Sequence, residues 1–268
     1  MELKEIYQQN KKEQTALGQF NVYNYEMIKG AIRAGKENNT PVLIGVSPSA
    51  VELIGIEEIS SMVNFYKKRN EGSFFINLDH GRDKKIIKKA IDLGFDGVHF
   101  DGSQLGFKEN ISIAQELVSY SKGKDVVIEG EIELIGAEIM TDPKKAKEFV
   151  AKTKIDSLAV NIGNKHGISK SGINPSLDLE RLENIASILP GIYLVLHGGS
   201  GTPKADLKEA IKKGIVKVNF ATELKNTYVD TLKKVVENNF GSKVLYNTHK
   251  ETFKAIQEKV EEKFNLLS

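Results

Sequence analysis

The sequence predicts an α/β protein in which eight parallel strands alternate with helices and close into one (β/α)8 (TIM) barrel spanning residues 1–268. Three observations predict it. Short β-branched runs recur along the chain, a longer amphipathic segment follows each run, and each predicted strand ends on a polar residue. The length of 268 residues also suits such a barrel, which typically has about 250. An open, doubly wound sheet is the structural alternative.

Eight short runs rich in β-branched and other apolar residues are the predicted strands. They are 18–22, 41–46, 74–79, 97–101, 126–131, 157–161, 192–197 and 216–219. Helical patterns lie between them, which implies right-handed crossovers and a parallel sheet. Glycines at strand entries and exits, such as Gly94 and Gly191, are typical of turns rather than of domain boundaries.

The predicted helices carry apolar residues on one face and Lys or Glu on the other. Clear examples are 83–93, 144–152 and 204–213. Beyond the last strand, 223–238 and 250–264 are both strongly helical. We therefore expect extra C-terminal helices, and we expect them to close the barrel.

Composition excludes several classes of function. The 38 basic and 36 acidic residues are well mixed, so there is no basic stripe for nucleic acid. The absence of Cys excludes disulfides, a thiol nucleophile and Cys-based zinc sites, so any zinc ligands here are His, Asp or Glu. The polar N-terminus has no signal core and no run is long enough to span a membrane. We expect a cytoplasmic enzyme without a membrane partner.

A polar or charged residue stands at the C-terminal end of every predicted strand. These residues are Asn21, Ser47, Asp79, Asp101, Glu131, Asn161, His197 and Asn219. Packing alone does not favour polar residues there, whereas the C-terminal face of an α/β barrel carries the active site. The pattern therefore predicts an enzyme.

Three of the five histidines fall at or just after predicted strand ends, each followed by glycine: His80, His166 and His197. A single histidine of this kind more often caps a turn or packs at the edge of the core. Three imidazoles on one rim instead match the ligand set of an open zinc site. His99 lies in mid-strand and is expected in the barrel interior, and His249 near a helix start is expected at the surface.

Four acidic residues are candidates for the chemistry of this rim. Asp79 precedes His80, so we expect it beside the metal, where it would transfer a proton to or from a substrate hydroxyl. Asp101 and Glu131 would orient ligands or bind a second or displaced metal. Glu138, in the next loop, would reach over the substrate. An ordinary surface salt bridge is the alternative for each.

A glycine-rich turn, HGGSGTP at 197–203, follows the seventh predicted strand and precedes a predicted helix. Small residues let backbone N–H groups approach an anion, and the loops after strands 7 and 8 are the usual phosphate site of such barrels. The candidate residues are Gly198, Ser200, Asn219 and Thr222. Ser47 would either bind phosphate or cap the next helix.

Several motifs together resemble the class II fructose-bisphosphate aldolases and the related tagatose-bisphosphate aldolases. They are LDHG at 78–81, NIGNKHGISK at 161–170, LHGGSGT at 196–202 and VNFATE at 218–223. Segments 20–24 and 101–103 extend the match, which covers nearly the whole chain in the right order.

The resemblance implies reversible aldol cleavage of fructose-1,6- or tagatose-1,6-bisphosphate to dihydroxyacetone phosphate and glyceraldehyde 3-phosphate. It implies Zn²⁺ on His80, His166 and His197, acting as a Lewis acid, with Asp79 as acid/base at the C4 hydroxyl. Asp101 and Glu131 match an alternative metal position, and a monovalent cation, Na⁺ or K⁺, is also implied. The implied substrate-binding residues are Asn21, Ser47, Gly167, Lys170, Gly198, Ser200, Asn219, Thr222 and Lys250. A homodimer or homotetramer is expected.

The chain departs from the family pattern in one loop and near the C-terminus. Glu138 matches the first of two loop acids, whereas Ile139 stands at what looks like the catalytic one. Lys250 replaces the usual arginine for the distal phosphate, giving a point charge instead of a planar fork. Two alternatives follow: a class II aldolase for another phosphorylated ketose or deoxy-ketose acid, or a non-catalytic sugar-phosphate-binding accessory subunit.

Overall fold

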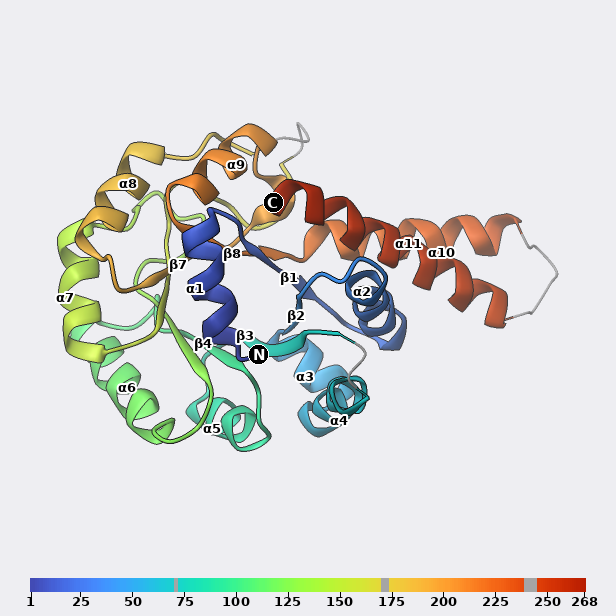
Figure 1. The fold of residues 1–268 in the computed structure, drawn as a ribbon, viewed down its shortest axis with the longest axis horizontal. Coiled ribbons are helices and arrows are strands. Elements are labelled where there is room, and N and C mark those ends of the chain that lie inside the picture. The colour runs from blue at the N-terminus through green and yellow to red at the C-terminus, as the bar shows by residue number, and fades with distance from the viewer. Residues whose placement is uncertain (70–71, 170–173, 239–244) are drawn as a thin grey trace.

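The computed structural model describes residues 1–69, 72–169, 174–238 and 245–268, and its centre is a closed barrel of eight parallel strands (Figure 1). The strands are β1 (Leu17–Asn21), β2 (Val42–Val46), β3 (Phe74–Gly81), β4 (Gly97–Asp101), β5 (Val127–Glu131), β6 (Ser157–Ala159), β7 (Tyr193–Leu196) and β8 (Ile215–Phe220). Neighbours in sequence are neighbours in the barrel, and β8 pairs with β1. The predicted TIM barrel is confirmed, and the open sheet is wrong.

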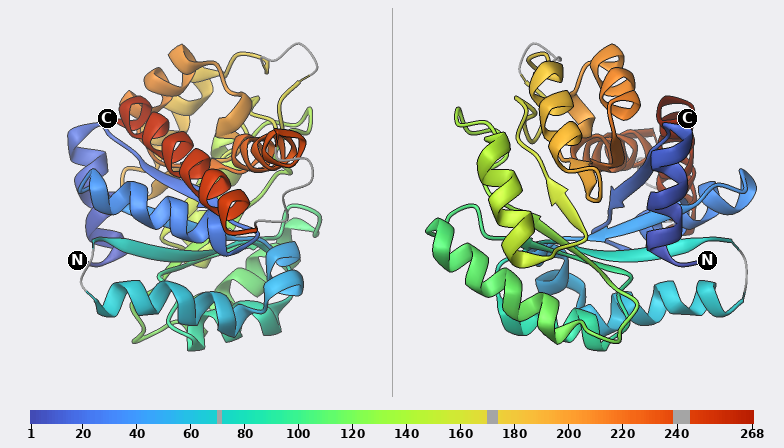
Figure 2. Two further views of the ribbon diagram at one scale, coloured as in Figure 1. Left: turned by 90° about the vertical axis from the view of Figure 1, so that its right-hand side faces the viewer. Right: turned by 60° about the vertical axis from the view of Figure 1, so that its left-hand side comes forward.

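Helices surround the barrel on its outside (Figure 2). They are α1 (Leu3–Glu13), α2 (Tyr25–Glu37), α3 (Pro48–Ile54), α4 (Ile56–Lys68), α5 (Lys84–Asp92), α6 (Phe107–Tyr120), α7 (Pro143–Thr153), α8 (Leu179–Ile188), α9 (Lys204–Lys212), α10 (Thr222–Asn238) and α11 (Leu245–Leu267). The helices predicted at 83–93, 144–152 and 204–213 are α5, α7 and α9. The helices predicted beyond the last strand are α10 and α11, and α11 packs against α2, α9 and β1, so it completes the ring of helices around the barrel as expected.

The N-terminal end of the barrel is covered by α1. Leu3, Ile6 and Tyr7 are buried and pack with Leu17 and Phe75 in a separate apolar cluster. The end of α11 packs against β1, where Phe264 contacts Phe20 and the backbone N–H of Ala16 donates to the Leu267 carbonyl over 2.9 Å. The polar N-terminal segment thus forms an amphipathic helix that covers the N-terminal end of the barrel.

Helix α11 packs against α2 and α10, and α10 and α11 form a hairpin that projects beyond the barrel on the right of Figure 1. Within the described residues, no helix combines the length and the apolar character needed to cross a membrane.

The inner wall above the apolar plug is polar. Alternate residues of a strand face the same side, so the residue two positions before each inward-facing rim residue also faces inward. The buried polar residues two positions before the rim are Gln19, Asn77, His99, Glu129 and Lys217, and Ser157 pairs with Glu129 at the same level; all are 2% exposed or less. Consequently most rim residues pack against a layer of buried polar side chains rather than against an apolar core.

Candidate active site

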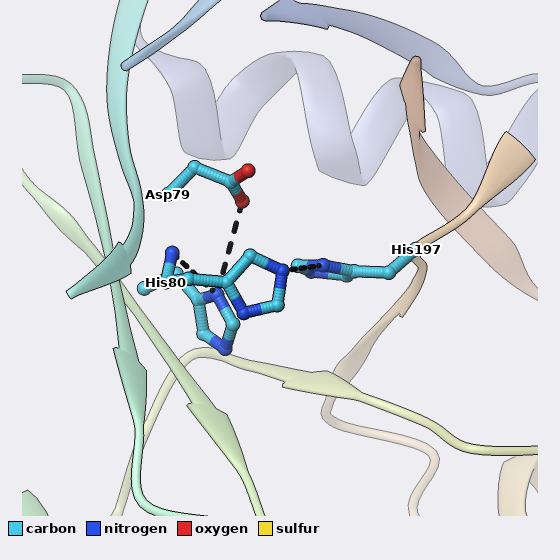
Figure 3. Close-up of side chains that lie close together, drawn as sticks. Asp79, His80 and His197 are labelled. Carbon is cyan, nitrogen blue, oxygen red and sulfur yellow. Dashed lines mark hydrogen bonds and ion pairs between the residues drawn. The ribbon is translucent and has the colours of Figure 1, made fainter. Parts of the chain in front are cut away.

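Three histidines from separate segments meet at the C-terminal end of the barrel. The ring centroid of His80 lies 4.6 Å from that of His197 and 5.0 Å from that of His166, and the His166 and His197 centroids lie 6.0 Å apart. Figure 3 shows His80 and His197 pointing toward each other from opposite sides of the site. The structure therefore brings together the three imidazoles that the sequence places near strand ends.

Strand β3 departs from regular geometry where it carries two consecutive site residues. Successive side chains of a regular strand face opposite sides, so Asp79 and His80 would not share a site. Here the register with β4 shifts between Leu78 and Gly81, and His80 adopts the left-handed conformation with φ of +52°. The backbone N–H of His80 donates to Nδ1 of the buried His99 over 3.1 Å, which supports this bend.

Acidic neighbours determine which nitrogen of each imidazole carries the proton. The Oε1 of Glu129 lies 2.9 Å from His197 Nε2, and Asp101 Oδ2 lies 3.4 Å from His80 Nδ1. In its neutral form each ring carries its proton on the nitrogen beside the carboxylate, which leaves the lone pairs on His197 Nδ1 and His80 Nε2. These two atoms face each other at 3.0 Å.

Two bare lone pairs at this separation repel, so the contact suits either a proton on one of the two nitrogens or a metal ion bound to both. Zinc bonds to nitrogen of 2.0–2.1 Å at a tetrahedral angle would separate two ligand nitrogens by about 3.3 Å, close to the separation seen here. The nitrogen donors without thiolates also suit zinc. The residues present thus fit a divalent metal held by His80 and His197. Possible ligand atoms of Asp79, His80, His99 and His197 lie within 4.8 Å of one another, and the ring of His166 lies beside this group, 5.0 Å from His80 between centroids.

His166 lies on the loop after β6, at the mouth of the site. Partial burial lowers its pKa to about 4, and the neighbouring His197 and His80 add to this effect. At neutral pH the ring is unprotonated and able to bind a metal.

Asp79 is held between two amide groups. Asn21 Nδ2 donates to its Oδ2 over 2.7 Å and Asn219 Nδ2 donates to its Oδ1 over 3.0 Å. Burial acts to raise the pKa of Asp79, but the surrounding His80, His99 and His197 outweigh it and hold the pKa well below its usual value. Asp79 is therefore an ionised carboxylate of fixed orientation that can accept a proton.

Asp101 and Glu131 lie behind His80 and form a second group of possible metal ligands with it. Glu131 Oε2 is 3.8 Å from His80 Nδ1 and 3.2 Å from Nε2 of His99. Both oxygens of Asp101 are engaged, Oδ1 by Ser103 over 2.6 Å and Oδ2 by Arg82 over 2.7 Å. This arrangement orients His80.

A buried ion pair lies beneath His197, and the sequence analysis did not identify it. Lys217 Nζ donates to Glu129 Oε2 over 2.6 Å, and the other oxygen of Glu129 holds the His197 ring. Burial raises the pKa of Glu129, but Lys217, His99 and His197 outweigh it and lower the pKa. The available signal was alternation, since Glu129 and Lys217 stand two residues before the rim residues Glu131 and Asn219 on their strands.

The site opens into a cavity of about 250 Å³. Its lining residues are Asn21, Tyr23, Ser47, Asp79, His80, His166, Gly167, His197, Gly198, Ser200, Asn219, Ala221, Thr222 and Lys225. Ser47 also caps α3, because its side chain accepts from the backbone N–H of Ala50. Lys225 is the one Lys or Arg among the described residues of this lining, and sequence analysis did not identify it.

The glycine-rich turn after β7 forms one wall of the cavity. Gly198 has φ of +74°, and a Cβ on it would collide with the Lys165 carbonyl of the preceding loop. A short 3₁₀ turn, Gly199–Gly201, leads into α9, and Ser200 Oγ accepts from the backbone N–H of Glu223. The turn thereby joins the loops after β6, β7 and β8 around one space.

Three predicted residues lie away from this cavity or outside the described residues. Glu138 is exposed on the loop after β5 and Lys250 is exposed near the start of α11; neither lines the cavity. Lys170 lies outside the described residues. The Glu138 loop is held to the rim by Asn161, whose Nδ2 lies within 3.1 Å of the carbonyls of Leu134, Ala137 and Ile139.

Two curated relatives match most of the chain. A sulfofructosephosphate aldolase of Alkalicoccus urumqiensis is 34% identical over 266 residues, which cover 95% of this chain and 92% of that protein. A fructose-bisphosphate aldolase of Staphylococcus aureus is 34% identical over 248 residues, covering 88% and 86%.

A solved structure and a family model point the same way. The crystal structure of the YdjI aldolase of Escherichia coli K12 superposes with a TM-score of 0.85 at 32% identity, covering 100% of this chain and 96% of that one. The model of class II fructose-bisphosphate aldolases matches residues 1–268. The chain belongs to the class II fructose-bisphosphate aldolase family.

Proposed function

We propose that this protein catalyses the reversible, zinc-dependent aldol cleavage of a ketose 1-phosphate that carries a second anionic group. The observation that carries the proposal is the meeting of an ionised carboxylate, Asp79, with three imidazoles in a single cavity. An accessory subunit that only binds sugar phosphates would need neither the fixed carboxylate nor the facing ring nitrogens.

The metal would be held by His80, His166 and His197, with Asp101 and Glu131 behind them. When bound, zinc supplies a Lewis acid that stabilises negative charge on the ketone oxygen. The chain itself fixes the ring orientations through Glu129 and Asp101. A monovalent cation near the phosphate remains a prediction.

Asp79 would move the proton that the cleavage requires. It accepts the proton of the C4 hydroxyl while the C3–C4 bond breaks, C4 becomes the aldehyde carbon, and the electron pair stays with the three-carbon phosphate fragment. A proton then returns to C3 of that fragment, and we assign this step to Glu138. Its exposed position requires the loop held by Asn161 to approach the cavity.

The phosphate on C1 would lie against the backbone of Gly198 and Ser200, with Gly167, Asn219 and Thr222 around it. Lys225 is suited to the distal anionic group, and Asn21 and Ser47 line the same cavity. Lys170 and Lys250 remain predicted substrate ligands.

Two substrate classes fit a single lysine charge. A ketose 1,6-bisphosphate, either fructose or tagatose bisphosphate, is the first candidate. Sulfofructose phosphate is the second, because an ammonium point charge does not select phosphate by bidentate geometry and a relative is named for that substrate.

Side-by-side turnover measurements test the proposal. Purified protein with zinc should cleave at least one of fructose bisphosphate, tagatose bisphosphate and sulfofructose phosphate, and a chelator or His197→Ala should abolish the cleavage. Chelator-insensitive cleavage, or none on this panel, would refute it. Glu138→Gln should slow solvent-deuterium exchange into dihydroxyacetone phosphate more than it affects substrate binding.

We also propose a homodimer or homotetramer. The projecting hairpin of α10 and α11 carries exposed apolar side chains, including Val229, Val236 and Tyr246, which suit burial between subunits. Light scattering coupled to gel filtration measures the mass directly, and a monomer at micromolar concentration would contradict this expectation.

A further inference from the structure

Beneath Asp79, three buried amide side chains from β1 and β3 form one continuous hydrogen-bonded chain. Asn77 Nδ2 donates to Gln19 Oε1 over 2.8 Å, Gln19 Nε2 donates to Asn21 Oδ1 over 3.0 Å, and Asn21 Nδ2 donates to Asp79 over 2.7 Å. We call Asn77, Gln19 and Asn21 the amide chain. All three are 3% exposed or less.

The charge on Asp79 sets the direction of every donor in the amide chain. An ionised carboxylate only accepts hydrogen bonds, so Asn21 must present its NH₂ group to it. The carbonyl oxygen of Asn21 then faces Gln19, which must donate, and the Gln19 oxygen must accept from Asn77. Reversing any one amide would place two donors or two acceptors against each other in a buried site.

Two glycines make room for the amide chain. Asn21, Gly45, Asn77 and Gly97 are paired in register across β1, β2, β3 and β4, so amides and glycines alternate at one level of the barrel. A Cβ on Gly45 would lie 2.8 Å from Gln19 Nε2, and one on Gly97 would lie 2.5 Å from Asn77 Oδ1. The backbone of neighbouring strands thus leaves the space that these side chains fill.

The two amides on Asp79 differ in their support. Asn21 is braced from below, because its oxygen accepts from Gln19. Asn219 Oδ1 is buried and has no hydrogen-bond partner among the described residues, and its Nδ2 also lies 3.3 Å from His197 Nδ1. The oxygen of Asn219 is therefore left without a donor among the described residues, whereas the oxygen of Asn21 is engaged by Gln19.

We propose that Gln19 and Asn77 are positioning residues that act through Asn21 to fix the plane of the Asp79 carboxylate for proton transfer. The inference rests on the proposed function, because it assigns a purpose to the orientation of Asp79. Neither Gln19 nor Asn77 lines the cavity, so neither touches the substrate.

Steady-state kinetics of the zinc-loaded full-length protein test the proposal on the substrate that it cleaves best. Gln19→Met keeps the length of the side chain but neither donates to Asn21 nor accepts well from Asn77. We expect kcat to fall about tenfold to a hundredfold, as for a displaced catalytic group, with KM within about twofold and zinc stoichiometry unchanged. Ser157→Ala is the matched control, since it removes a buried inner-wall hydroxyl that has no hydrogen-bond partner in the described part of the chain, and it should change neither constant.

A double-mutant cycle separates positioning from a general structural effect. If Gln19 acts through Asn21, adding Gln19→Met to Asn21→Leu should leave kcat within about twofold of Asn21→Leu alone. Additive losses would overturn the proposal, as would a Gln19→Met enzyme with kcat within twofold of wild type or with reduced zinc content.

A second variant covers a failure of Gln19→Met to fold. Asn77→Leu breaks the amide chain one step further from Asp79, and a smaller fall in kcat with KM unchanged is expected. An unchanged kcat in that variant overturns the proposal. If the wild-type protein cleaves no phosphoketose on the panel, the proposed function and this inference both fall; if it does and the variants match it, only this inference falls.

Discussion

Two sides of the barrel wall support the same site by different chemistry. On the side of β1 and β3, the neutral amide chain holds Asp79. On the side of β5 and β8, the buried ion pair of Glu129 and Lys217 holds His197. We call these the amide side and the ionic side.

The difference predicts which single residues matter for folding stability and which matter for the orientation of catalytic groups. A buried charge that loses its partner is strongly destabilising, costing about 3–5 kcal/mol, whereas an unpaired buried amide costs about 1–3 kcal/mol. The ionic side should therefore tolerate change poorly in folding, and the amide side should reveal its role mainly in turnover.

Breaking the ionic side should give the largest effect. Glu129→Leu leaves Lys217 buried without a partner, so we expect the free energy of unfolding to fall by about 3–5 kcal/mol in denaturant titrations. The double variant Glu129→Leu with Lys217→Met should recover most of that loss. Both variants should bind zinc about 10–100-fold more weakly in chelator competition, since the orienting partner of His197 is gone. Wild-type zinc affinity in the double variant would contradict the orienting role.

Breaking the amide side should cost less stability. Asn77→Leu removes one donor and leaves Gln19 Oε1 unsatisfied, and we expect a loss of about 1–3 kcal/mol in the same titrations. Its zinc affinity should match that of wild type. A stability loss as large as that of Glu129→Leu would remove the contrast between the two sides.

The fold was predictable because its signals are local. Eight apolar runs, their spacing and the polar residue at each end are properties of the sequence alone, and the observed strand bounds agree within a few residues. Helix α1 was not predicted because its apolar face is short, with Leu3, Ile6 and Tyr7 among polar neighbours.

The site was predictable only for residues next to strand ends. Glu129 and Gln19 were missed because their roles depend on which side chains meet across the barrel, and Lys225 was missed because it lies one turn into α10. The exposed position of Glu138 could not be predicted either, since it depends on how Asn161 holds the loop.

The pair of Arg82 and Asp101 lies after β3 and at the end of β4, outside both sides, and should matter less. Arg82 is about half exposed, at 54% of its side chain, and Ser103 still holds Asp101 when it is removed. We expect Arg82→Ala to change the free energy of unfolding by at most about 1 kcal/mol. A loss above that in denaturant titrations would show that the pair belongs with the buried ionic side.

The smallest expected effect concerns pH and the exposed rim. The pKa of His166 falls from the ordinary 6.5 to about 4 on folding, so between these values the unfolded chain binds the proton and the folded chain does not. The stability contribution of His166 is present above pH 6.5 and is lost as pH falls toward 4. In thermal melts of the metal-free protein between pH 4 and 6.5, the melting temperature of His166→Asn should rise slightly less steeply with pH than that of wild type. An identical pH dependence would refute the lowered pKa of His166.

The left-handed backbone at His80 sets backbone stability against metal binding. Residues other than glycine pay about 1–2 kcal/mol for that conformation, and β-branched residues suffer most. Replacing His80 with glycine would remove the backbone strain in β3 and would also delete a candidate metal ligand. An alanine at the same position would lose the ring and keep the strain. At this position folding stability favours glycine, whereas metal binding requires histidine, and the chain carries histidine.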